Sequence, residues 1–167
     1  MPLTTFRLAS LTQKCAAALL SLAAATAPMH LNAQNKAPTV NISDGVVKMG
    51  LLLDMNSLYE DVAGMGTVTA VKMAIEDFGG KVHGMPIELV YADHQNKADL
   101  AGTKAREWFD TQKVDMIGDV AASATALSAA EVAKQKNKVI IMSGPGTSRL
   151  TNENCSAVSV HYTWDTY

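Results

Sequence analysis

The sequence predicts an α/β protein with a doubly wound parallel sheet, and three observations lead to this prediction. From residue 46 onward, short apolar segments alternate with longer segments of helical spacing. The apolar segments are nearly continuous, which is typical of strands buried on both faces of a sheet. Strands that alternate with helices of ten or more residues need crossover connections, so neighbouring strands are expected to be parallel.

Four apolar segments define the expected strands. They cover residues 46–53, 87–92, 114–118 and 139–143. Each is rich in Val, Ile, Leu or Met and is short enough for a buried strand. A fifth strand is expected near residues 157–161.

Three segments with helical spacing lie between these strands, at about residues 66–78, 99–111 and 124–136. A Gly-Gly pair at 79–80 follows the first, as glycine does where helices end. The second is expected to bury five apolar residues: Leu100, Ala101, Ala105, Trp108 and Phe109. In the third, Ser123 is the expected N-cap and lysines occupy the last turn.

Residues 1–33 predict a signal peptide. Two basic residues precede an apolar run at 15–27 that is rich in Ala and Leu. This run is shorter than the roughly 20 residues that a membrane-spanning helix needs. Cleavage is expected after Ala33, and the polar residues 34–45 are expected to form a flexible leader. We therefore expect an exported, periplasmic protein.

The composition argues against several classes of protein. The chain has 167 residues with 14 basic and 16 acidic side chains, and only 5% of its residues are aromatic. Scattered charges and few aromatic rings disfavour a nucleic-acid partner. No cofactor loop or metal-ligand spacing is present, so no cofactor is expected. Without the signal peptide, Cys155 is the only cysteine, which predicts a buried free thiol or a disulfide partner beyond residue 167.

Ligands of open α/β sheets bind beyond the carboxyl ends of the strands. Four loops are expected there, at residues 54–66, 93–96, 119–123 and 143–148. The last contains two glycines and three hydroxyl side chains. The third leads into a helix N-terminus, where free N–H groups attract an anion such as a carboxylate. Together they favour a site for a small carboxylate, although ordinary turns and caps would give the same pattern.

Catalysis is disfavoured. Asp93, His94 and Asp119 could supply a base and its orienting group or part of a metal site, but no nucleophile lies beside them. The Asp-His-Gln-Asn sequence at 93–96 is expected to be a solvated turn. Gly-Pro-Gly at 144–146 is not the Gly-x-Ser-x-Gly turn of a hydrolase.

Three longer motifs follow one another along the chain. The first is Val-Lys-Met-Gly-Leu-Leu at 47–52, before a Ser/Leu/Tyr loop and a Gly-x-Gly helix start. The second is Gly-Met-Pro-Ile-Glu-Leu-Val at 84–90, leading into Ala-Asp-His-Gln-Asn-Lys. The third is Val-Ile-Ile-Met-Ser-Gly-Pro-Gly-Thr-Ser at 139–148, followed by Cys155 and the ending His-Tyr-Thr-Trp-Asp-Thr-Tyr.

These motifs resemble the branched-chain amino-acid type of ABC-transporter solute-binding proteins, and the resemblance covers residues 46–167. It implies two α/β lobes joined by a hinge, of which 46–167 would be the N-terminal lobe and the second lobe is missing. It also implies a non-enzymatic role as the extracytoplasmic substrate-binding component of an ABC importer. The expected partners are a small carboxylate ligand and the permease subunits at the inner membrane.

The resemblance further implies that the ligand carboxylate meets main-chain N–H groups and hydroxyls of the third and fourth loops. Carried onto this chain, the ligand-binding positions are Tyr59, Ser123, Ala124, Gly144, Pro145, Thr147, Trp164 and Asp165. The third loop has few hydroxyls, and the 161–167 end looks more like family members associated with aromatic or other organic acids. We therefore expect an amino acid or a related small carboxylate, aromatic ones included.

Two other functions stay open. A ligand-sensing lobe of a receptor or chemotaxis partner has the same α/β pattern, and a downstream transmembrane helix would favour it. A small α/β enzyme that uses Asp93 or His94 is the third hypothesis.

Overall fold

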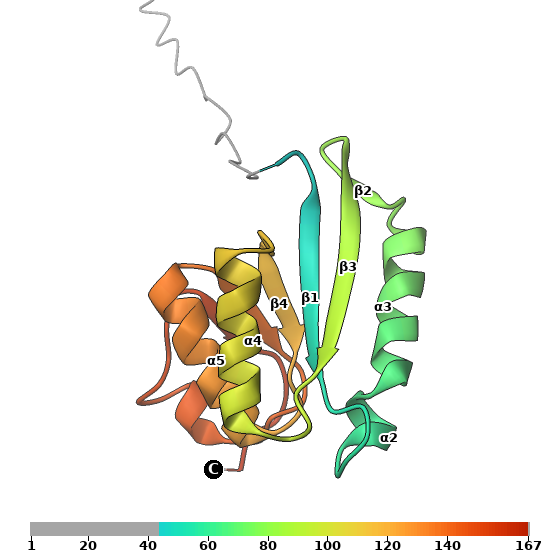
Figure 1. The fold of residues 1–167 in the computed structure, drawn as a ribbon. Helices are drawn as coiled ribbons and strands as arrows, with labels where there is room; N and C mark the ends of the chain where they lie inside the picture. Colours follow the sequence, from blue (N-terminus) through green and yellow to red (C-terminus); the bar gives the residue numbers. More distant parts are fainter. Residues whose placement is uncertain (1–43, 167) are drawn as a thin grey trace, which may run out of the picture. The chain divides into compact units, whose positions relative to one another are not determined.

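The structure is a computed structural model that describes residues 44–166, and these residues form a six-stranded sheet flanked by helices (Figure 1). The predicted signal peptide and the predicted leader up to residue 43 lie outside the described residues. In spatial order, the strands are β2 (Lys81–Val82), β3 (Met85–Asp93), β1 (Val47–Leu53), β4 (Met116–Asp119), β5 (Val139–Met142) and β6 (Ser159–His161). Only β2 is antiparallel to its neighbour.

The predicted elements are present, with ends shifted by at most two residues. The helical elements are α2 (Glu60–Ala63), α3 (Met65–Asp77), α4 (Ala98–Asp110), α5 (Ser123–Lys136) and the 3-10 turn η1 (Ser148–Leu150). The sequence did not predict α2, β2 or η1. No helix among residues 44–166 is long and apolar enough to cross a membrane.

The central strand β1 is buried on both faces. Leu51 and Leu53 pack with Val68 of α3, whereas Leu52 packs with side chains of α4 and α5. Successive side chains of a strand point to opposite faces of the sheet. Helix α3 therefore covers one face, and α4 and α5 cover the other, as Figure 1 shows. This arrangement confirms the predicted doubly wound sheet.

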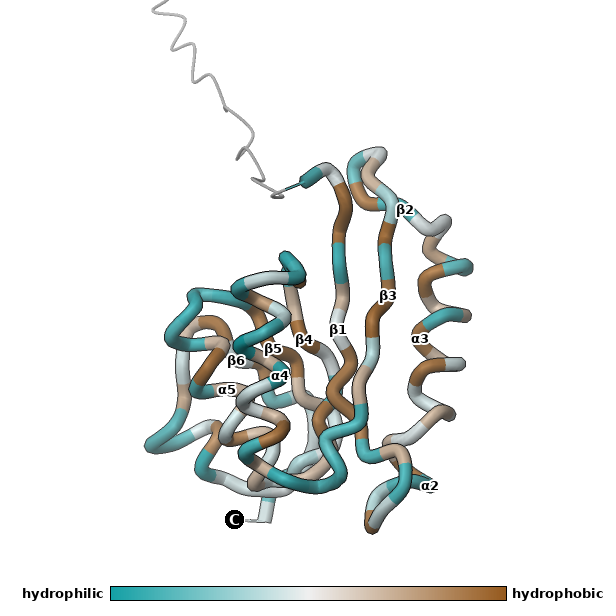
Figure 2. Tube along the Cα trace, in the orientation of Figure 1, coloured by the Kyte–Doolittle hydropathy of each residue, from teal (hydrophilic) through white to brown (hydrophobic). Residues whose placement is uncertain are grey.

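The larger core lies between the sheet and helices α4 and α5. Ala105, Trp108 and Phe109 of α4 belong to it, as predicted. Leu100 does not: its side chain is 37% exposed, because it lies beside the buried stripe of α4 rather than on it. Figure 2 shows the resulting pattern, with apolar residues along the strands and polar ones recurring on the helices.

The parallel strands end at the same edge of the sheet. In the strand register, Asp93 of β3 lies beside Leu53, Asp119 of β4 lies beside Leu52, and His161 of β6 lies beside Met142. The loops that follow these strands are therefore neighbours, although they are far apart in the sequence.

Candidate functional site

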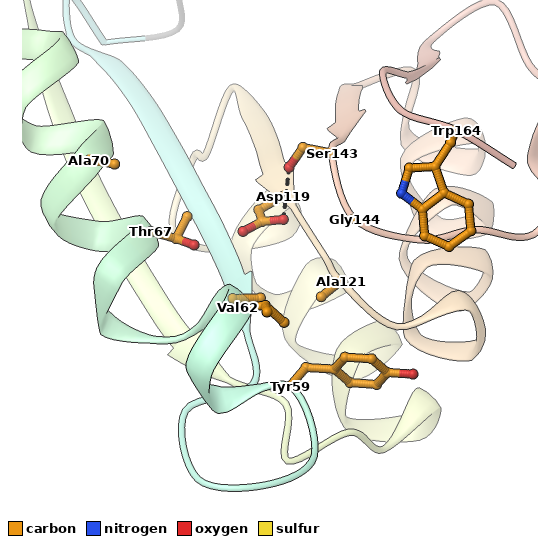
Figure 3. Close-up of a pocket in the computed structure, with 10 residues that line it drawn as sticks. Tyr59, Val62, Thr67, Ala70, Asp119, Ala121, Ser143, Gly144 and Trp164 are labelled. Atoms are coloured by element: carbon orange, nitrogen blue, oxygen red, sulfur yellow. Dashed lines mark hydrogen bonds between the residues drawn. The ribbon is translucent and has the colours of Figure 1, made fainter.

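Two adjoining pockets lie at this edge, with volumes of about 460 and 410 Å³. We call them the α3-side pocket and the α5-side pocket. The α3-side pocket is lined by Tyr59, Val62, Ala63, Thr67, Ala70, Asp119, Ala121, Ser143, Gly144 and Trp164 (Figure 3). The α5-side pocket is lined by Tyr59, Ala121, Ser123, Gly144, Gly146, Thr147, Trp164 and Thr166. Four residues line both, so the pockets form one continuous site.

Five of the eight predicted ligand-binding positions line this site: Tyr59, Ser123, Gly144, Thr147 and Trp164. The other three line neither pocket. Ala124 is exposed next to Ser123 on α5, and Asp165 follows Trp164 on the exposed C-terminal segment. Pro145 is buried, and its carbonyl accepts a hydrogen bond from His161 Nε2 at 2.5 Å. His161, at the end of β6, thus has a hydrogen-bond partner.

Asp54 holds the first loop and so positions Tyr59. Its carboxylate is fully buried and accepts hydrogen bonds from the N–H of Ser57 at 3.1 Å and from that of Tyr59 at 2.9 Å. The Ser57 hydroxyl adds a third at 2.6 Å. Burial alone would raise the pKa of Asp54, but these hydrogen bonds together lower it below its ordinary value.

The N-terminus of α5 is open toward the α5-side pocket. Its N-cap is Ala122 and no side chain caps it, so the prediction that Ser123 is the cap is wrong by one residue. Because the first N–H groups of a helix have no partner within it, they are available to a ligand. The Thr125 hydroxyl donates to the Ala122 carbonyl at 2.8 Å and so fixes this first turn.

Close contacts explain why glycine occupies two positions of the fourth loop. A Cβ on Gly144 would lie 2.7 Å from Ala121 Cα, so only glycine allows the two backbones to touch there. A Cβ on Gly146 would lie 2.6 Å from the Trp164 ring, which packs over this residue. The N–H of Thr166 donates to the Gly146 carbonyl at 2.7 Å. The C-terminal segment is thereby held against the fourth loop.

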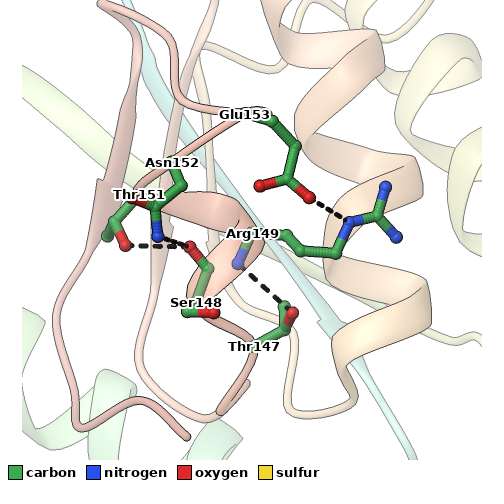
Figure 4. Close-up of polar contacts among 6 residues, drawn as sticks. All are labelled: Thr147, Ser148, Arg149, Thr151, Asn152 and Glu153. Carbon is green, nitrogen blue, oxygen red and sulfur yellow. Dashed lines mark hydrogen bonds and ion pairs between the residues drawn. The ribbon is translucent and has the colours of Figure 1, made fainter. Parts of the chain in front are cut away.

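Thr147 is the N-cap of the 3-10 turn η1, which follows the fourth loop (Figure 4). Its hydroxyl oxygen accepts a hydrogen bond from the N–H of Arg149 at 3.4 Å. The carbonyl of Ser148 accepts from the Thr151 hydroxyl at 3.0 Å and from the Asn152 amide at 2.8 Å. Since Thr147 uses its oxygen as an acceptor, its O–H can still donate to a ligand.

Asp119 lines the α3-side pocket, whereas the sequence analysis named it individually only as a candidate for catalysis or for a metal site. Its Oδ1 accepts a hydrogen bond from the Ser143 hydroxyl at 2.9 Å (Figure 3). Burial raises the pKa of Asp119, and hydrogen bonds from Ser143 and Thr67 only partly offset this effect. The rule that ligands meet strand ends could have indicated Asp119, because it is the last residue of β4. Thr67, at the start of α3, gave no such signal.

Residues 95–96 form a turn in which Gln95 is exposed, but His94 is buried at 1% exposure, so the prediction of a solvated turn is wrong for His94. Its Nδ1 accepts a hydrogen bond from the N–H of Asn96 at 3.0 Å, which leaves the ring proton on Nε2. Burial lowers the pKa of His94, although three nearby carboxylates oppose the effect. Asp93 ties two loops together by accepting from the N–H groups of Met55 and Gln95. These residues build the edge of the sheet.

Two further observations concern metals and the cysteine. Within residues 44–166, no group of three His, Cys, Asp or Glu side chains is placed to hold a metal ion. Cys155 is exposed and free among the described residues, so a buried thiol is ruled out. A disulfide partner beyond residue 167 stays a prediction.

An α/β lobe with an open site at its strand ends is the architecture of a ligand-binding protein. The sequence pattern of the periplasmic binding protein family matches residues 46–167, and the chain belongs to this family. This confirms the resemblance that the sequence motifs indicated. Comparison with curated proteins gave no match.

Solved structures give the same assignment. A periplasmic binding protein from Burkholderia mallei is 54% identical, with a TM-score of 0.71 over 72% of this chain and 32% of its own. A branched chain amino acid ABC transporter periplasmic ligand-binding protein from Burkholderia xenovorans is 42% identical, with a TM-score of 0.69 over 71% and 32%. A solute binding protein of an ABC transporter from Rhodopseudomonas palustris, in complex with 3,4-dihydroxy benzoic acid, is 27% identical, with a TM-score of 0.66 over 73% and 33%. The chain spans about a third of the length of these relatives.

Proposed function

We propose that this chain supplies one lobe of the solute receptor of an ABC importer, exported to the periplasm, and that it captures small carboxylates. Family membership supports the class of protein. The names of the relatives point to two kinds of solute, branched-chain amino acids and dihydroxybenzoate. Both carry a carboxylate. The receptor would release its solute to permease subunits in the inner membrane.

The uncapped N-terminus of α5 is the observation that carries this proposal. Ser123 and Thr147 add hydroxyls beside its free N–H groups, and no acidic side chain occupies the first turn. A helix N-terminus contributes about 0.3–1 kcal/mol toward an anion. Each hydrogen bond to a charged group contributes about 1.5–3 kcal/mol. No lysine or arginine lines the α5-side pocket, so these neutral donors would hold the carboxylate.

The rest of the site suits the apolar body of such a solute. Val62, Ala63 and Ala70 line the α3-side pocket from α2 and α3. The Trp164 ring lines both pockets and is 67% exposed, so it can cover a ligand with its free face. Exposed aromatic rings bind ligand rings and aliphatic chains through their apolar faces. A carboxylate at one end and an apolar body at the other match the two pockets.

A fixed negative charge at the helix N-terminus tests the proposal. The variant is Ser123→Asp, made in the full chain together with any residues that the gene encodes after Tyr167. Its matched control is Ser123→Asn, which has nearly the same size without the charge. Ligand binding is measured by calorimetry with leucine, valine, benzoate and dihydroxybenzoate, and stability by thermal unfolding.

We expect Ser123→Asp to keep or raise the unfolding temperature, because an acid at a helix N-terminus is favourable. Carboxylate binding should nevertheless fall at least tenfold, because the introduced charge competes for the same N–H groups. Ser123→Asn should bind more tightly than Ser123→Asp. Unchanged carboxylate binding by Ser123→Asp would show that α5 is not the anion site.

A further inference from the structure

The two pockets differ in their polar groups. The α5-side pocket offers donors, namely the first N–H groups of α5 and the Thr147 hydroxyl. The polar groups of the α3-side pocket centre on the Asp119 carboxylate, between Thr67 and Ser143 (Figure 3). A ligand that fills both pockets therefore meets donors at one end and an acid at the other.

The hydroxyl protons next to Asp119 determine which kind of ligand group can hydrogen-bond to it. The Ser143 hydroxyl has one proton and donates it to Asp119 Oδ1 at 2.9 Å. The Thr67 side chain lines the same pocket and lowers the pKa of this carboxylate. A carboxylate has about four acceptor positions. With the Ser143 proton used, the Asp119 carboxylate still has free acceptor positions, so a ligand group that binds it must bring its own proton.

Among residues 44–166, no lysine or arginine compensates this carboxylate within the α3-side pocket. The buried His94 is the base whose charge would act on Asp119, but burial lowers its pKa, so its ring is neutral at neutral pH. The carboxylate of a ligand would be repelled here and would bind at the α5-side pocket. A donor on the body of the ligand would be attracted.

The backbone at this position is unusual. Asp119 and Val120 have φ angles of +66° and +83°, a region that non-glycine residues seldom adopt. For a β-branched residue such as Val120 this conformation is strained. The conformation leaves Asp119 on the wall of the pocket, with Val120 buried in the core behind it.

We propose that Asp119 is a specificity-determining residue that selects solutes carrying a hydroxyl or ammonium donor in addition to their carboxylate. This inference rests on the proposed function, since it assumes that the carboxylate binds at α5. Asp119 accepts the donor of the ligand while the first turn of α5 binds its carboxylate. Carboxylates of the same shape without a donor bind less tightly.

Two pairs of ligands test this assignment in the full chain, again with any residues encoded after Tyr167. Benzoate and 4-hydroxybenzoate differ by a hydroxyl, and 4-methylpentanoate and leucine differ by an ammonium group. The variant is Asp119→Asn, whose oxygen can still accept from Ser143 while its NH₂ replaces the free acceptor. The control is Asp110→Asn, which removes the same charge from the exposed C-terminal end of α4.

In at least one pair, the wild type should bind the member with the donor about tenfold or more tightly, the size of a hydrogen bond to a charged group. The responding pair distinguishes a hydroxyl from an ammonium. Asp119→Asn should close this gap by weakening that member alone, and Asp110→Asn should preserve it.

Three results would overturn the assignment. If the gap persists in Asp119→Asn, or if the wild type binds both members of each pair equally, Asp119 is not the selective group, while the proposed function stands. If the wild type binds none of the four carboxylates, the proposed function fails, and the role of Asp119 fails with it. Because binding of the ligand without a donor is measured for every variant, a misfolded protein cannot imitate the expected pattern.

Discussion

Substitution of Gly144 by alanine tests the contact between the third and fourth loops. The new Cβ would lie 2.7 Å from Ala121 Cα and 3.2 Å from Ala121 Cβ. Carbon atoms in contact are about 3.5–4.0 Å apart, so the loops would have to separate by about 1 Å. Neither atom of Ala121 can rotate away, because both are fixed by the backbone. Overpacking of this kind costs about 1–3 kcal/mol.

Thermal unfolding and ligand titration measure this prediction. At about 4 °C per kcal/mol for a domain of this size, Gly144→Ala should lower the unfolding temperature by roughly 4–12 °C. Ligand affinity should fall as well, because Gly144 and Ala121 line both pockets. A shift of about 1 Å takes a hydrogen bond of about 2.9 Å out of range.

Gly66→Ala is the matched control. No atom lies within 4 Å of the position that its Cβ would occupy. Alanine also favours a helix over glycine by up to about 1 kcal/mol, so this variant should be as stable as the wild type or slightly more so. If Gly144→Ala unfolds and binds like the wild type, the two loops do not touch as the structure shows. If both variants are destabilised alike, the close contact is not the cause.

Two carboxylates give opposite predictions for the dependence of stability on pH. The folded pKa of Asp54 is lowered, so its stabilisation is complete above the unfolded value near 3.8 and is lost as the pH falls through the lower folded value. Denaturant titrations should show a loss of stability below about pH 4 that is smaller in Asp54→Asn. The folded pKa of Asp119 is raised, so its stabilisation is present below the unfolded value and is lost as the pH rises through the folded one. Asp119→Asn should therefore be more stable than the wild type at pH 7 and similar to it at pH 3, and lower stability at pH 7 would contradict this reasoning.

The sequence predicted the main elements because each has a pattern of its own. Continuous apolar runs marked β1, β4 and β5, and helical spacing with 79–80 as a stop marked α3. The missed elements are short. Helix α2 has four residues and β2 has two, too few for a helical or strand period to emerge. Helix α2 is part of the candidate site, because Val62 and Ala63 line the α3-side pocket.

The site was predictable as a set of loops rather than as a set of side chains. Parallel strands bring their carboxyl ends to one edge, so the third and fourth loops were expected there. Which side chain faces the pocket depends on the local backbone. Neighbours on a helix point about 100° apart, so Ser123 lines the pocket while Ala124 is exposed. Thr67 lines the site from α3, on the other face of the sheet from α5. No local sequence pattern predicts such a contact.

Asp54 and Asp119 lie at neighbouring strand ends of one edge of the sheet, but their pKa values shift in opposite directions. Asp54 accepts three hydrogen bonds from its own loop, its pKa is lowered, and it stabilises the fold. Asp119 lies at the end of the neighbouring strand in a strained backbone, its pKa is raised, and its charge costs stability at neutral pH. A charged group that destabilises the empty protein gains most from a ligand that solvates it. The donor of a bound solute would supply that solvation at Asp119, and Asp54 has no such need.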